Sequence, residues 1–288
     1  MILSSKKAAE FLNVNESTVK RWADNGKLKS FKTPGGHRKF KFEDLKKVSE
    51  ENNYLTPDMS AYSISIKTFN EIKDRDYGSL NKKFGKYLLK GDTGASYDLI
   101  YLLYLDKVPV AQIFDEVVKQ SMENIGDLWS KGLLGIEDEH IASGALLSVI
   151  HRFENDITDK YYSKSKKFNK TALCTGLENQ LHDIGLLCVK ITLKHLGWKV
   201  IYPGSNLPEN SIINLLKIEK PDLLCLSFKS HGLNGKLIKV SSEIMKTADK
   251  LNIKIFTGGE AAENGSNGVI KINDMVTFTK HLKELKQK

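Results

Sequence analysis

Apolar residues recur at helical spacing through the middle of the chain, from about residue 62 to residue 157. One such stripe contains Leu99, Leu102 and Leu103, and another runs through residues 137–157. The stretch between them carries a third stripe, made of Val110, Ile113, Val117, Met122, Ile125 and Leu128. A repeat of three to four residues is typical of amphipathic helices, so we predict a four-helix bundle in this region.

Towards the C-terminus the pattern changes to short apolar runs that alternate with helical segments. Strands are predicted at 171–175, 198–203, 222–228 and 253–259, and helices at 183–196, 209–219, 236–251 and 273–286. Repeated strand–helix–strand order produces a parallel sheet with right-handed crossovers. The predicted fold class is therefore multidomain, with an α/β domain that follows an all-helical one.

The first fifty residues predict two short helices followed by a β-hairpin. Ser4 can cap the first helix and Asn15 the second. The hairpin turns at residues 33–36, and His37 and Arg38 begin its returning strand. A short helix from Phe42 closes this unit.

The second of these helices has a buried face and a polar face. Val19 and Trp22 are predicted to face the core, and the basic side chains point outward. In helix-turn-helix proteins the second helix lies in the major groove, and basic loops reach phosphates or the minor groove. The candidate DNA contacts are Thr18, Lys20, Arg21, His37 and Arg38. The alternative, a solvated face of a small helical domain, is disfavoured because helix, turn, helix and basic hairpin occur in the right order.

The charge distribution supports a polyanionic partner for this segment. The chain has a net charge of +9, and residues 1–50 hold twelve Lys and Arg against six Asp and Glu. Such a concentration of positive charge is typical of nucleic-acid binding. The three cysteines are far apart, and no secretory signal or membrane-spanning stretch is evident, so we expect a cytoplasmic protein.

These patterns divide the chain into three domains, with a linker after the first. The predicted domains are 1–52, 62–160 and 168–288, and residues 52–61 lack periodicity and contain a proline. No catalytic triad, P-loop or paired catalytic carboxylates stand out, so we predict no enzymatic activity.

The first domain resembles the DNA-binding domain of the MerR superfamily. The resemblance covers about residues 2–50 and includes the wing sequence TPGGHR at residues 33–38. It implies a winged helix-turn-helix that binds operator DNA.

A histidine in the α/β domain is a candidate metal ligand. His182 falls in the loop after the first predicted strand, at the sheet edge where ligands bind in open parallel sheets. Gly185 would let a bulky group approach the helix that follows. A neutral imidazole is a good ligand for a transition metal, although a single loop histidine is more often a surface residue.

The sequence around His182 resembles the Rossmann-like (flavodoxin-like) cobalamin-binding domain. That domain has an Asp/Glu-x-His-x-x-Gly motif, which is followed by a serine motif and a Gly-Gly pair. The matching positions here are His182, Gly185, Ser227, Gly258 and Gly259. The resemblance implies that His182 binds cobalt from below and that the displaced nucleotide tail lies beside Ser227 and the glycines.

Two positions depart from the cobalamin motif. Gln180 stands where an acidic residue normally accepts the imidazole N–H, and Glu178 is near enough in sequence to replace it. Phe228 and Lys229 also depart from the usual residues after the motif serine.

Trp129, Glu139 and His140 resemble the motif of the helical cap that precedes such domains in light-sensing regulators. The resemblance implies that Trp129 covers the adenosyl group of adenosylcobalamin and that Glu139 and His140 help enclose it. On spacing alone, a core tryptophan followed by capping charges is the alternative. Members of the group often have a histidine directly after the tryptophan, whereas this chain has Ser130.

The order of the three domains resembles that of cobalamin-dependent photoreceptor regulators of the CarH/LitR kind. This resemblance implies a repressor that binds operator DNA in the dark as a homo-oligomer, a tetramer, and releases it when light breaks the Co–C bond. Two alternatives stay open. The same regulator could sense another corrinoid or haem, or have lost its cofactor; or the chain could be a corrinoid methyl carrier, which the N-terminal domain disfavours.

Overall fold

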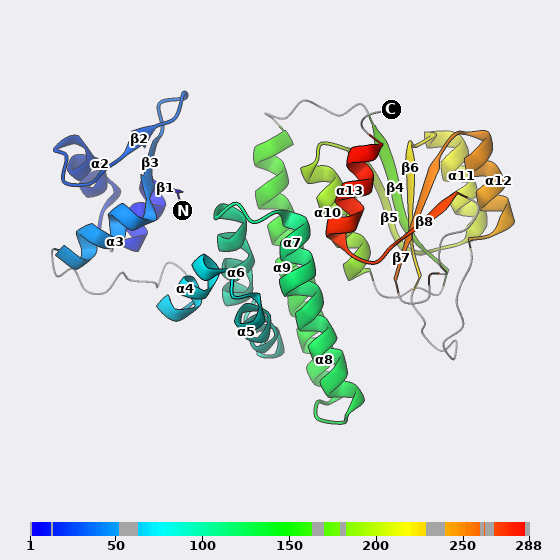
Figure 1. The fold of residues 1–288 in the computed structure, drawn as a ribbon, viewed down its shortest axis with the longest axis horizontal. Coiled ribbons are helices and arrows are strands. Elements are labelled where there is room, and N and C mark those ends of the chain that lie inside the picture. Colours follow the sequence, from blue (N-terminus) through cyan, green and yellow to red (C-terminus); the bar gives the residue numbers. More distant parts are fainter. Residues whose placement is uncertain are drawn as a thin grey trace. The chain divides into compact units, whose positions relative to one another are not determined.

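The structure is a computed structural model of the chain. It describes residues 2–12, 14–51, 63–162, 170–178, 183–228, 240–259, 262 and 268–285 (Figure 1). The chain forms two compact units, residues 1–109 with 116–149 and residues 110–115 with 150–288. The predicted linker at 52–61 lies outside the described residues. The helix before it ends at Glu51.

The N-terminal domain consists of three helices and a three-stranded antiparallel sheet. Its elements are β1 (Ile2–Ser4), α1 (Ser5–Phe11), α2 (Glu16–Asp24), β2 (Phe31–Lys32), β3 (Arg38–Lys41) and α3 (Phe42–Glu51). The sheet order is β1-β3-β2, so the predicted hairpin is confirmed and β1 adds a strand that the sequence did not predict. Val19 and Trp22 are buried, as expected for the inner face of α2.

The two predicted caps of this domain differ. The hydroxyl of Ser4 accepts a hydrogen bond from the amide of Lys7 (3.3 Å), as predicted. Asn15 occupies the cap position of α2, but its side chain accepts no capping bond, so that prediction was wrong. The backbone carbonyl of Asn15 accepts the Thr18 amide instead (2.9 Å), which satisfies the group that the side chain would have bound.

The middle of the chain is helical, as the apolar stripes predicted. Its elements are α4 (Ile66–Asp74), α5 (Tyr77–Leu89), α6 (Thr93–Leu105), α7 (Val110–Ile113), the π-helical η2 (Phe114–Lys119), α8 (Gln120–Ser130) and α9 (Ile136–Tyr162). The segments α7, η2 and α8 follow one another without a break and form one continuous helical segment. Together with α5, α6 and α9 it makes up the long helical segments of this region. Asp92 caps α6 by accepting the Ala95 amide (2.9 Å).

The buried stripe of this long segment ends earlier than predicted. Val110, Ile113, Val117 and Ile125 are buried, and Met122 is half-buried. Leu128 is exposed, which corrects the prediction that it belongs to the core. Leu128 lies in the last turn of α8, directly before Trp129, which is also exposed.

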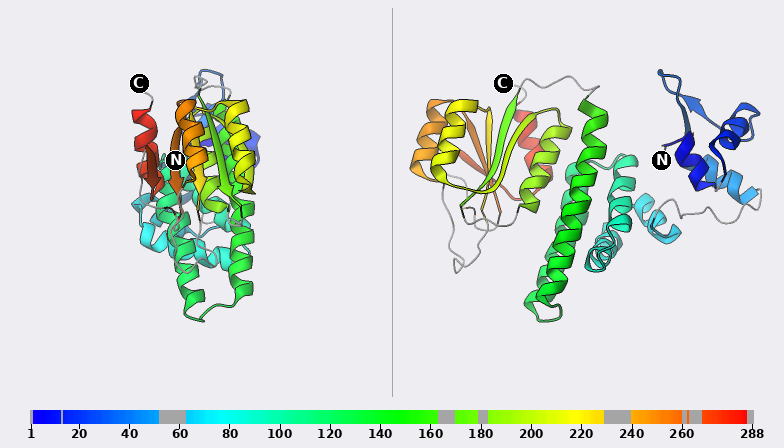
Figure 2. Two further views of the ribbon diagram at one scale, coloured as in Figure 1. Left: turned by 90° about the vertical axis from the view of Figure 1, so that its right-hand side faces the viewer. Right: turned by 180° about the vertical axis from the view of Figure 1, so that it is seen from behind.

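The C-terminal domain is a five-stranded parallel sheet with helices on both faces. Its elements are β4 (Thr171–Leu177), α10 (Ile184–His195), β5 (Lys199–Leu207), α11 (Glu209–Glu219), β6 (Leu223–Ser227), α12 (Ser242–Lys250), β7 (Lys254–Gly258), β8 (Val269–Ile272) and α13 (Met275–Glu284). Helices α10 and α13 pack together on one face and α11 and α12 on the other (Figure 2). The sequence predicted all of these elements except β8.

The strand order of this sheet is β5-β4-β6-β7-β8. In a doubly wound sheet of this order, ligands bind where the chain direction reverses, at the carboxyl ends of the first and third strands in sequence. Those strands are β4 and β6. The predicted flavodoxin-like topology is therefore confirmed, and it places the expected binding edge at the ends of these two strands.

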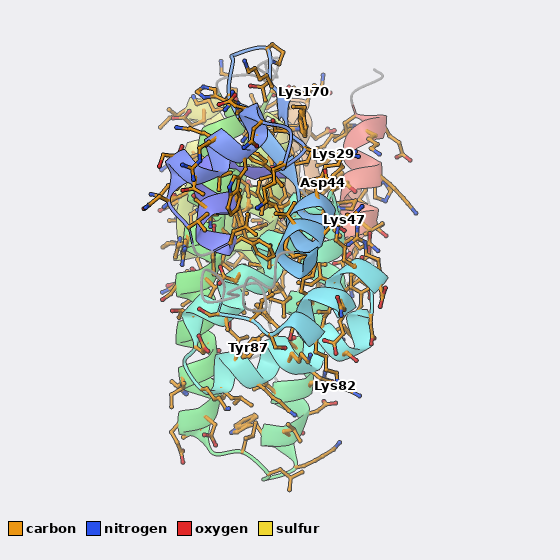
Figure 3. All side chains as sticks on the ribbon, turned by 90° about the vertical axis from the view of Figure 1, so that its left-hand side faces the viewer. Lys29, Asp44, Lys47, Lys82, Tyr87 and Lys170 are labelled. Atoms are coloured by element: carbon orange, nitrogen blue, oxygen red, sulfur yellow. The ribbon has the colours of Figure 1, made fainter. Side chains whose placement is uncertain are left out.

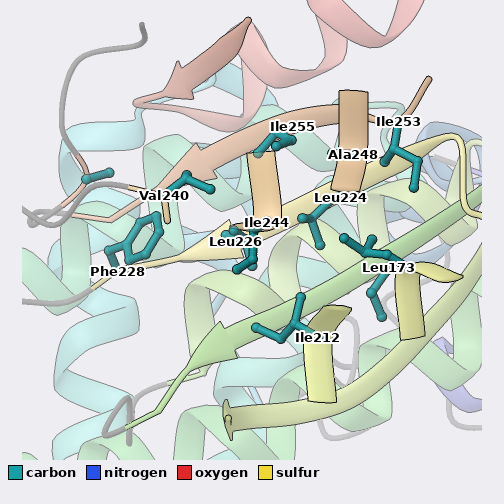
Figure 4. Packing of buried hydrophobic residues seen from close by; sticks show 12 residues of the cluster. Leu173, Ile212, Leu224, Leu226, Phe228, Val240, Ile244, Ala248, Ile253 and Ile255 are labelled. Carbon is teal, nitrogen blue, oxygen red and sulfur yellow. The ribbon is translucent and has the colours of Figure 1, made fainter. Parts of the chain in front are cut away.

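The core of the α/β domain lies between the sheet and the α11–α12 pair (Figure 4). Its buried members include Leu173, Ile212, Leu216, Leu224, Leu226, Phe228, Ile244, Ala248 and Ile255. Full burial of each such leucine, isoleucine or phenylalanine contributes about 1.5–3 kcal/mol. The strands that end at the expected binding edge are thus packed on one face against a buried apolar layer.

The three cysteines are free and buried. Burial raises the pKa of Cys188 to about 12, so this thiol stays protonated at neutral pH. No helix in the described part of the chain combines the length and apolar character that a membrane span requires.

Candidate functional site

The outward face of α2 presents the predicted DNA contacts. Lys20 and Arg21 are exposed, and Thr18 is half-buried. The Lys20 ammonium forms an ion pair with Glu16 one turn earlier (2.8 Å). Both side chains of this pair are well exposed, so the pair is weak and can open to a phosphate.

Arg38 of the wing is tied to α2. Its guanidinium donates to both carboxylate oxygens of Asp24 and to the carbonyl of Lys20 (3.1 Å). A fork of this kind fixes geometry as well as charge. The structure therefore gives Arg38 a second role that the sequence did not suggest, which is to hold β3 against the helix.

The turn of the wing is tight and exposed. The amide of Gly36 donates to the carbonyl of Thr33 (2.8 Å), and Gly36 has a φ of 76°, a conformation that glycine adopts without strain. His37 follows at the exposed end of the hairpin. An open groove between the wing, α2 and the start of α1 is lined mainly by basic residues, which are Lys6, Lys20, Lys32, His37, Arg38 and Lys39. Lys29 and Lys47, labelled in Figure 3, add exposed charge elsewhere on this domain.

The helical domain carries Trp129, Glu139 and His140 at one end. Trp129 lies in the last turn of α8 and is 49% exposed, which argues against a core role. Glu139 and His140 lie in the first turns of α9, as predicted. The carboxylate of Glu139 accepts the Ser143 hydroxyl (2.7 Å) and lies 3.3 Å from Nδ1 of His140.

Large apolar side chains are exposed around Trp129. We call this set the tip patch; it consists of Leu128, Trp129, Leu133, Ile136 and Ile141, from the end of α8 to the start of α9. Leu133 is 68% exposed. Several large apolar side chains exposed within one short segment are a candidate contact surface for a ligand or partner.

Ser130 occupies the position after the tryptophan. Its hydroxyl donates to the backbone carbonyl of Asp127 (2.9 Å). The side chain is thus turned back onto its own helix.

The binding edge of the α/β sheet has a row of small residues. Gly176 of β4, Ser227 of β6 and Gly258 of β7 are aligned in register. Gly259 has a φ of 95°, and a Cβ there would clash with the carbonyl group of Phe228. Small residues across three adjacent strands leave room for a flat group to lie on the backbone.

The start of α10 also leaves open space. A Cβ on Gly185 would meet no atom within 4 Å among the described residues. Packing among the described residues therefore does not require a glycine at this position. The predicted ligand His182 and its neighbour Gln180 lie outside the described residues, and Glu178 is exposed.

Three residues of this edge escaped the sequence analysis. Gly176 could have been found as a glycine at the end of a strand. Asp183, in the cap position of α10, and Tyr202, on β5, form a hydrogen bond between the Tyr202 hydroxyl and the Asp183 carboxylate (3.1 Å). Asp183 and Tyr202 belong to different elements, and no local sequence pattern links them. Only the packing of the parallel sheet brings the two side chains together.

Comparison with known proteins finds two types of domain within this chain. Residues 2–53 match the sequence model of a helix-turn-helix domain, and residues 80–153 match that of a B12 binding domain. The HTH-type transcriptional repressor CarH of Myxococcus xanthus is 22% identical over 278 residues, which cover 89% of this chain and 88% of that protein. These matches support a transcription regulator that has a helix-turn-helix domain and a B12 binding domain and is similar to CarH.

One further curated relative and one solved structure resemble part of this chain. The trimethylamine corrinoid protein of Methanosarcina barkeri is 23% identical over 148 residues, 51% of this chain and 67% of that protein. Among solved structures, the monomethylamine corrinoid protein of the same organism superimposes with a TM-score of 0.56 at 14% identity, over 72% of this chain and 99% of that one. This second likeness concerns the fold alone.

Proposed function

We propose that the chain is a transcriptional repressor whose binding to operator DNA is controlled by adenosylcobalamin. The observation that carries the proposal is the exposed Trp129 in the tip patch, within the segment that matches a B12 binding domain. Exposed aromatic surface of this size is costly in water unless a ligand covers it. A corrin ring with its adenosyl group offers both the apolar area and the flat shape required.

The residues of the binding edge would hold the lower face of the cofactor. His182 is the proposed cobalt ligand, and Gly185 leaves space at the start of α10. Ser227, Gly258 and Gly259 would receive the nucleotide tail, because backbone without bulky side chains can lie against a planar base. On the upper face, Trp129 would cover the adenosyl group while Glu139 and His140 flank it.

The DNA-binding residues act through charge and shape. Thr18, Lys20 and Arg21 of α2 would enter the major groove, with Lys20 exchanging Glu16 for a phosphate. His37 lies at the exposed end of the wing, and Arg38 keeps the wing in place through Asp24. A repressor with several copies of this domain, as in a tetramer, would bind repeated operator sites more tightly than a single copy.

Light is the proposed signal. When bound, adenosylcobalamin supplies a Co–C bond that visible light breaks. Loss of the adenosyl group would uncover Trp129 and change the balance between two packings of the chain, which is how a ligand shifts a bistable protein. Ser130 bears no ring nitrogen and its hydroxyl is engaged with Asp127, so the lit state has to form without a second nitrogen ligand from this position.

Absorption spectroscopy of the purified chain tests this proposal. The protein is incubated with adenosylcobalamin, methylcobalamin, haem or no addition, then desalted and measured before and after green light. We expect retention of adenosylcobalamin and a spectral change on illumination. Retention of haem alone, or of nothing, would overturn the cofactor assignment, and retention without a light response would overturn the light sensor.

A corrinoid methyl carrier is the second candidate, because the trimethylamine corrinoid protein matches about half of the chain. A methyl-transfer assay with methylcobalamin-loaded protein separates the two. The exposed basic groove of the N-terminal domain favours the regulator, since a methyl carrier has no use for it.

A further inference from the structure

Four polar side chains form a connected column inside the second compact unit, from the C-terminal part of α9 to the start of α10. Glu154 pairs with Lys190 (2.8 Å), and their side chains are only 7% and 10% exposed. The Lys190 ammonium lies 4.9 Å from the ring centroid of Tyr202. The Tyr202 hydroxyl donates to the Asp183 carboxylate (3.1 Å), which completes the column.

Each member of the column has a partner that offsets the cost of its burial. Glu154 also accepts from Lys194 (2.8 Å), and the face of an aromatic ring attracts a lysine ammonium. Burial, followed by the nearby Asp183 carboxylate, raises the pKa of Tyr202 well above its usual value. The phenol therefore stays protonated and remains a donor at any physiological pH.

The column changes what Asp183 does at the start of α10. Asp183 holds the cap position of this helix, but its side chain makes no capping bond. Asp92 and Asp274, in the same position of α6 and α13, do cap their helices, by accepting the amides of Ala95 (2.9 Å) and Thr277 (2.6 Å). Asp183 differs from these two residues in having helical backbone angles (φ −119°, ψ −4°). Its carboxylate accepts the Tyr202 hydroxyl and leaves the first amides of α10 uncapped.

This arrangement keeps one end of α10 open. Gly185, two residues after Asp183, has free space on the side where a Cβ would lie. His182 directly precedes Asp183 in the sequence. A capping carboxylate would fold back over the first turn, at the place where the proposed cofactor has to approach.

We propose that Tyr202 is a positioning residue of the cobalamin site: it holds Asp183 away from the first turn of α10 and thereby sets the backbone next to His182. The Glu154–Lys190 pair fixes the Tyr202 ring from the other side. This inference rests on the proposed function, because it takes His182 as the cobalt ligand.

Tyr202→Phe tests it, since the substitution removes only the hydroxyl that binds Asp183. Full-length chain labelled with ¹⁵N-histidine is loaded with cobalamin, reduced to the Co(II) form and examined by electron paramagnetic resonance. A ¹⁵N ligand from the protein splits the cobalt lines into doublets, whereas the unlabelled nucleotide base splits them into triplets. Affinity is measured in parallel by absorption titration with hydroxocobalamin.

We expect doublets in the unsubstituted protein. In Tyr202→Phe we expect about tenfold weaker binding, as for loss of a group that orients a metal ligand, together with a smaller doublet fraction. Tyr87→Phe, which removes a tyrosine hydroxyl from α5, should match the unsubstituted protein in both measurements. Equal affinity and equal doublets in Tyr202→Phe would overturn the inference and leave the proposed function intact. If the unsubstituted protein binds no cobalamin, the proposed function fails and the inference fails with it.

A second pair of variants decides the matter if Tyr202→Phe does not fold. Asp183→Asn keeps an oxygen that can accept the Tyr202 hydroxyl, whereas Asp183→Ala removes it. We expect Asp183→Asn to retain the doublet signal and Asp183→Ala to lose about tenfold in affinity with a smaller doublet fraction. Identical behaviour of the two variants would contradict the proposed role of the Tyr202–Asp183 bond.

Discussion

The DNA-binding domain and the second compact unit use charged residues in opposite ways. In the first, Lys20, Arg21 and His37 are exposed, and their ion pairs, such as Lys20–Glu16, are open to water. In the second, Glu154 and Lys190 are buried and depend on each other. Exposed charges contribute individually small and salt-dependent terms, whereas a buried charge without its partner is strongly unfavourable. Substitutions in the two domains should therefore differ in size and in their response to salt.

The largest effect is expected from Glu154→Ala. It leaves the buried Lys190 ammonium without its carboxylate, and breaking a buried pair in this way costs about 3 kcal/mol or more in free energy of unfolding. Urea denaturation measures this loss. The matched control, Glu123→Ala, breaks an exposed pair with Lys119 (3.9 Å) and should change stability by less than about 0.5 kcal/mol. Equal effects of the two substitutions would remove the contrast between buried and exposed charge.

The same pair predicts a pH dependence. Burial alone would raise the pKa of Glu154, but hydrogen bonds from Lys190 and Lys194 outweigh it and lower the pKa below its usual 4.5. A lowered folded-state pKa stabilises the fold above the unfolded value, and this stability is lost as the pH falls below about 4.5 through the folded value. The urea midpoint is measured from about pH 6 to about pH 3, a range chosen to include the pKa of a glutamate. It should fall more steeply with falling pH in the unsubstituted protein than in Glu154→Gln.

His182→Ala should have the next largest effect, on cobalamin binding. Loss of a residue that only orients a metal ligand weakens binding by up to about a hundredfold. We expect loss of the cobalt ligand itself to weaken binding by about this much. His151→Ala, on the exposed face of α9, is the control and should bind as the unsubstituted protein does. Titration with hydroxocobalamin measures both. Unchanged affinity in His182→Ala would place the ligand elsewhere.

Arg21→Ala should have a moderate effect, confined to DNA binding. We expect about tenfold weaker binding and a salt slope reduced by about one, because one phosphate or base contact is lost. Lys217→Ala, which removes an exposed lysine from α11, should change neither. Fluorescence anisotropy with a duplex selected from random DNA, repeated over a range of salt, gives both quantities. An equal loss in Lys217→Ala would mean that overall charge, and not α2, determines binding.

Arg38→Lys should have the smallest effect. The variant keeps the charge but loses the fork to Asp24, and we expect a loss of stability of about 0.5 kcal/mol. Asp24→Ala should cost about the same, and the double variant no more than either one, because all three break the same interaction. If neither substitution lowers stability, the wing-anchoring role is wrong; weaker DNA binding in Arg38→Lys alone would show that Arg38 also contacts DNA.

The sequence predicted most of the elements and the binding edge, because periodicity and strand–helix order are local signals. It missed β1 and β8, which are edge strands of three and four residues and too short to carry a pattern. It also placed Leu128 in the core, because a helical apolar repeat does not show how far along the helix burial extends. The bond between Tyr202 and Asp183 and the fork between Arg38 and Asp24 were beyond reach, because each joins residues that only tertiary packing brings together.

The most direct test of the account is DNA affinity in defined cofactor states. The full chain is measured by anisotropy on a selected duplex without cofactor, with adenosylcobalamin in the dark, and with the same sample after green light. The account predicts that adenosylcobalamin in the dark strengthens binding at least about tenfold, or about 1.4 kcal/mol, and that light reverses the gain. Equal affinity in all three states would contradict it.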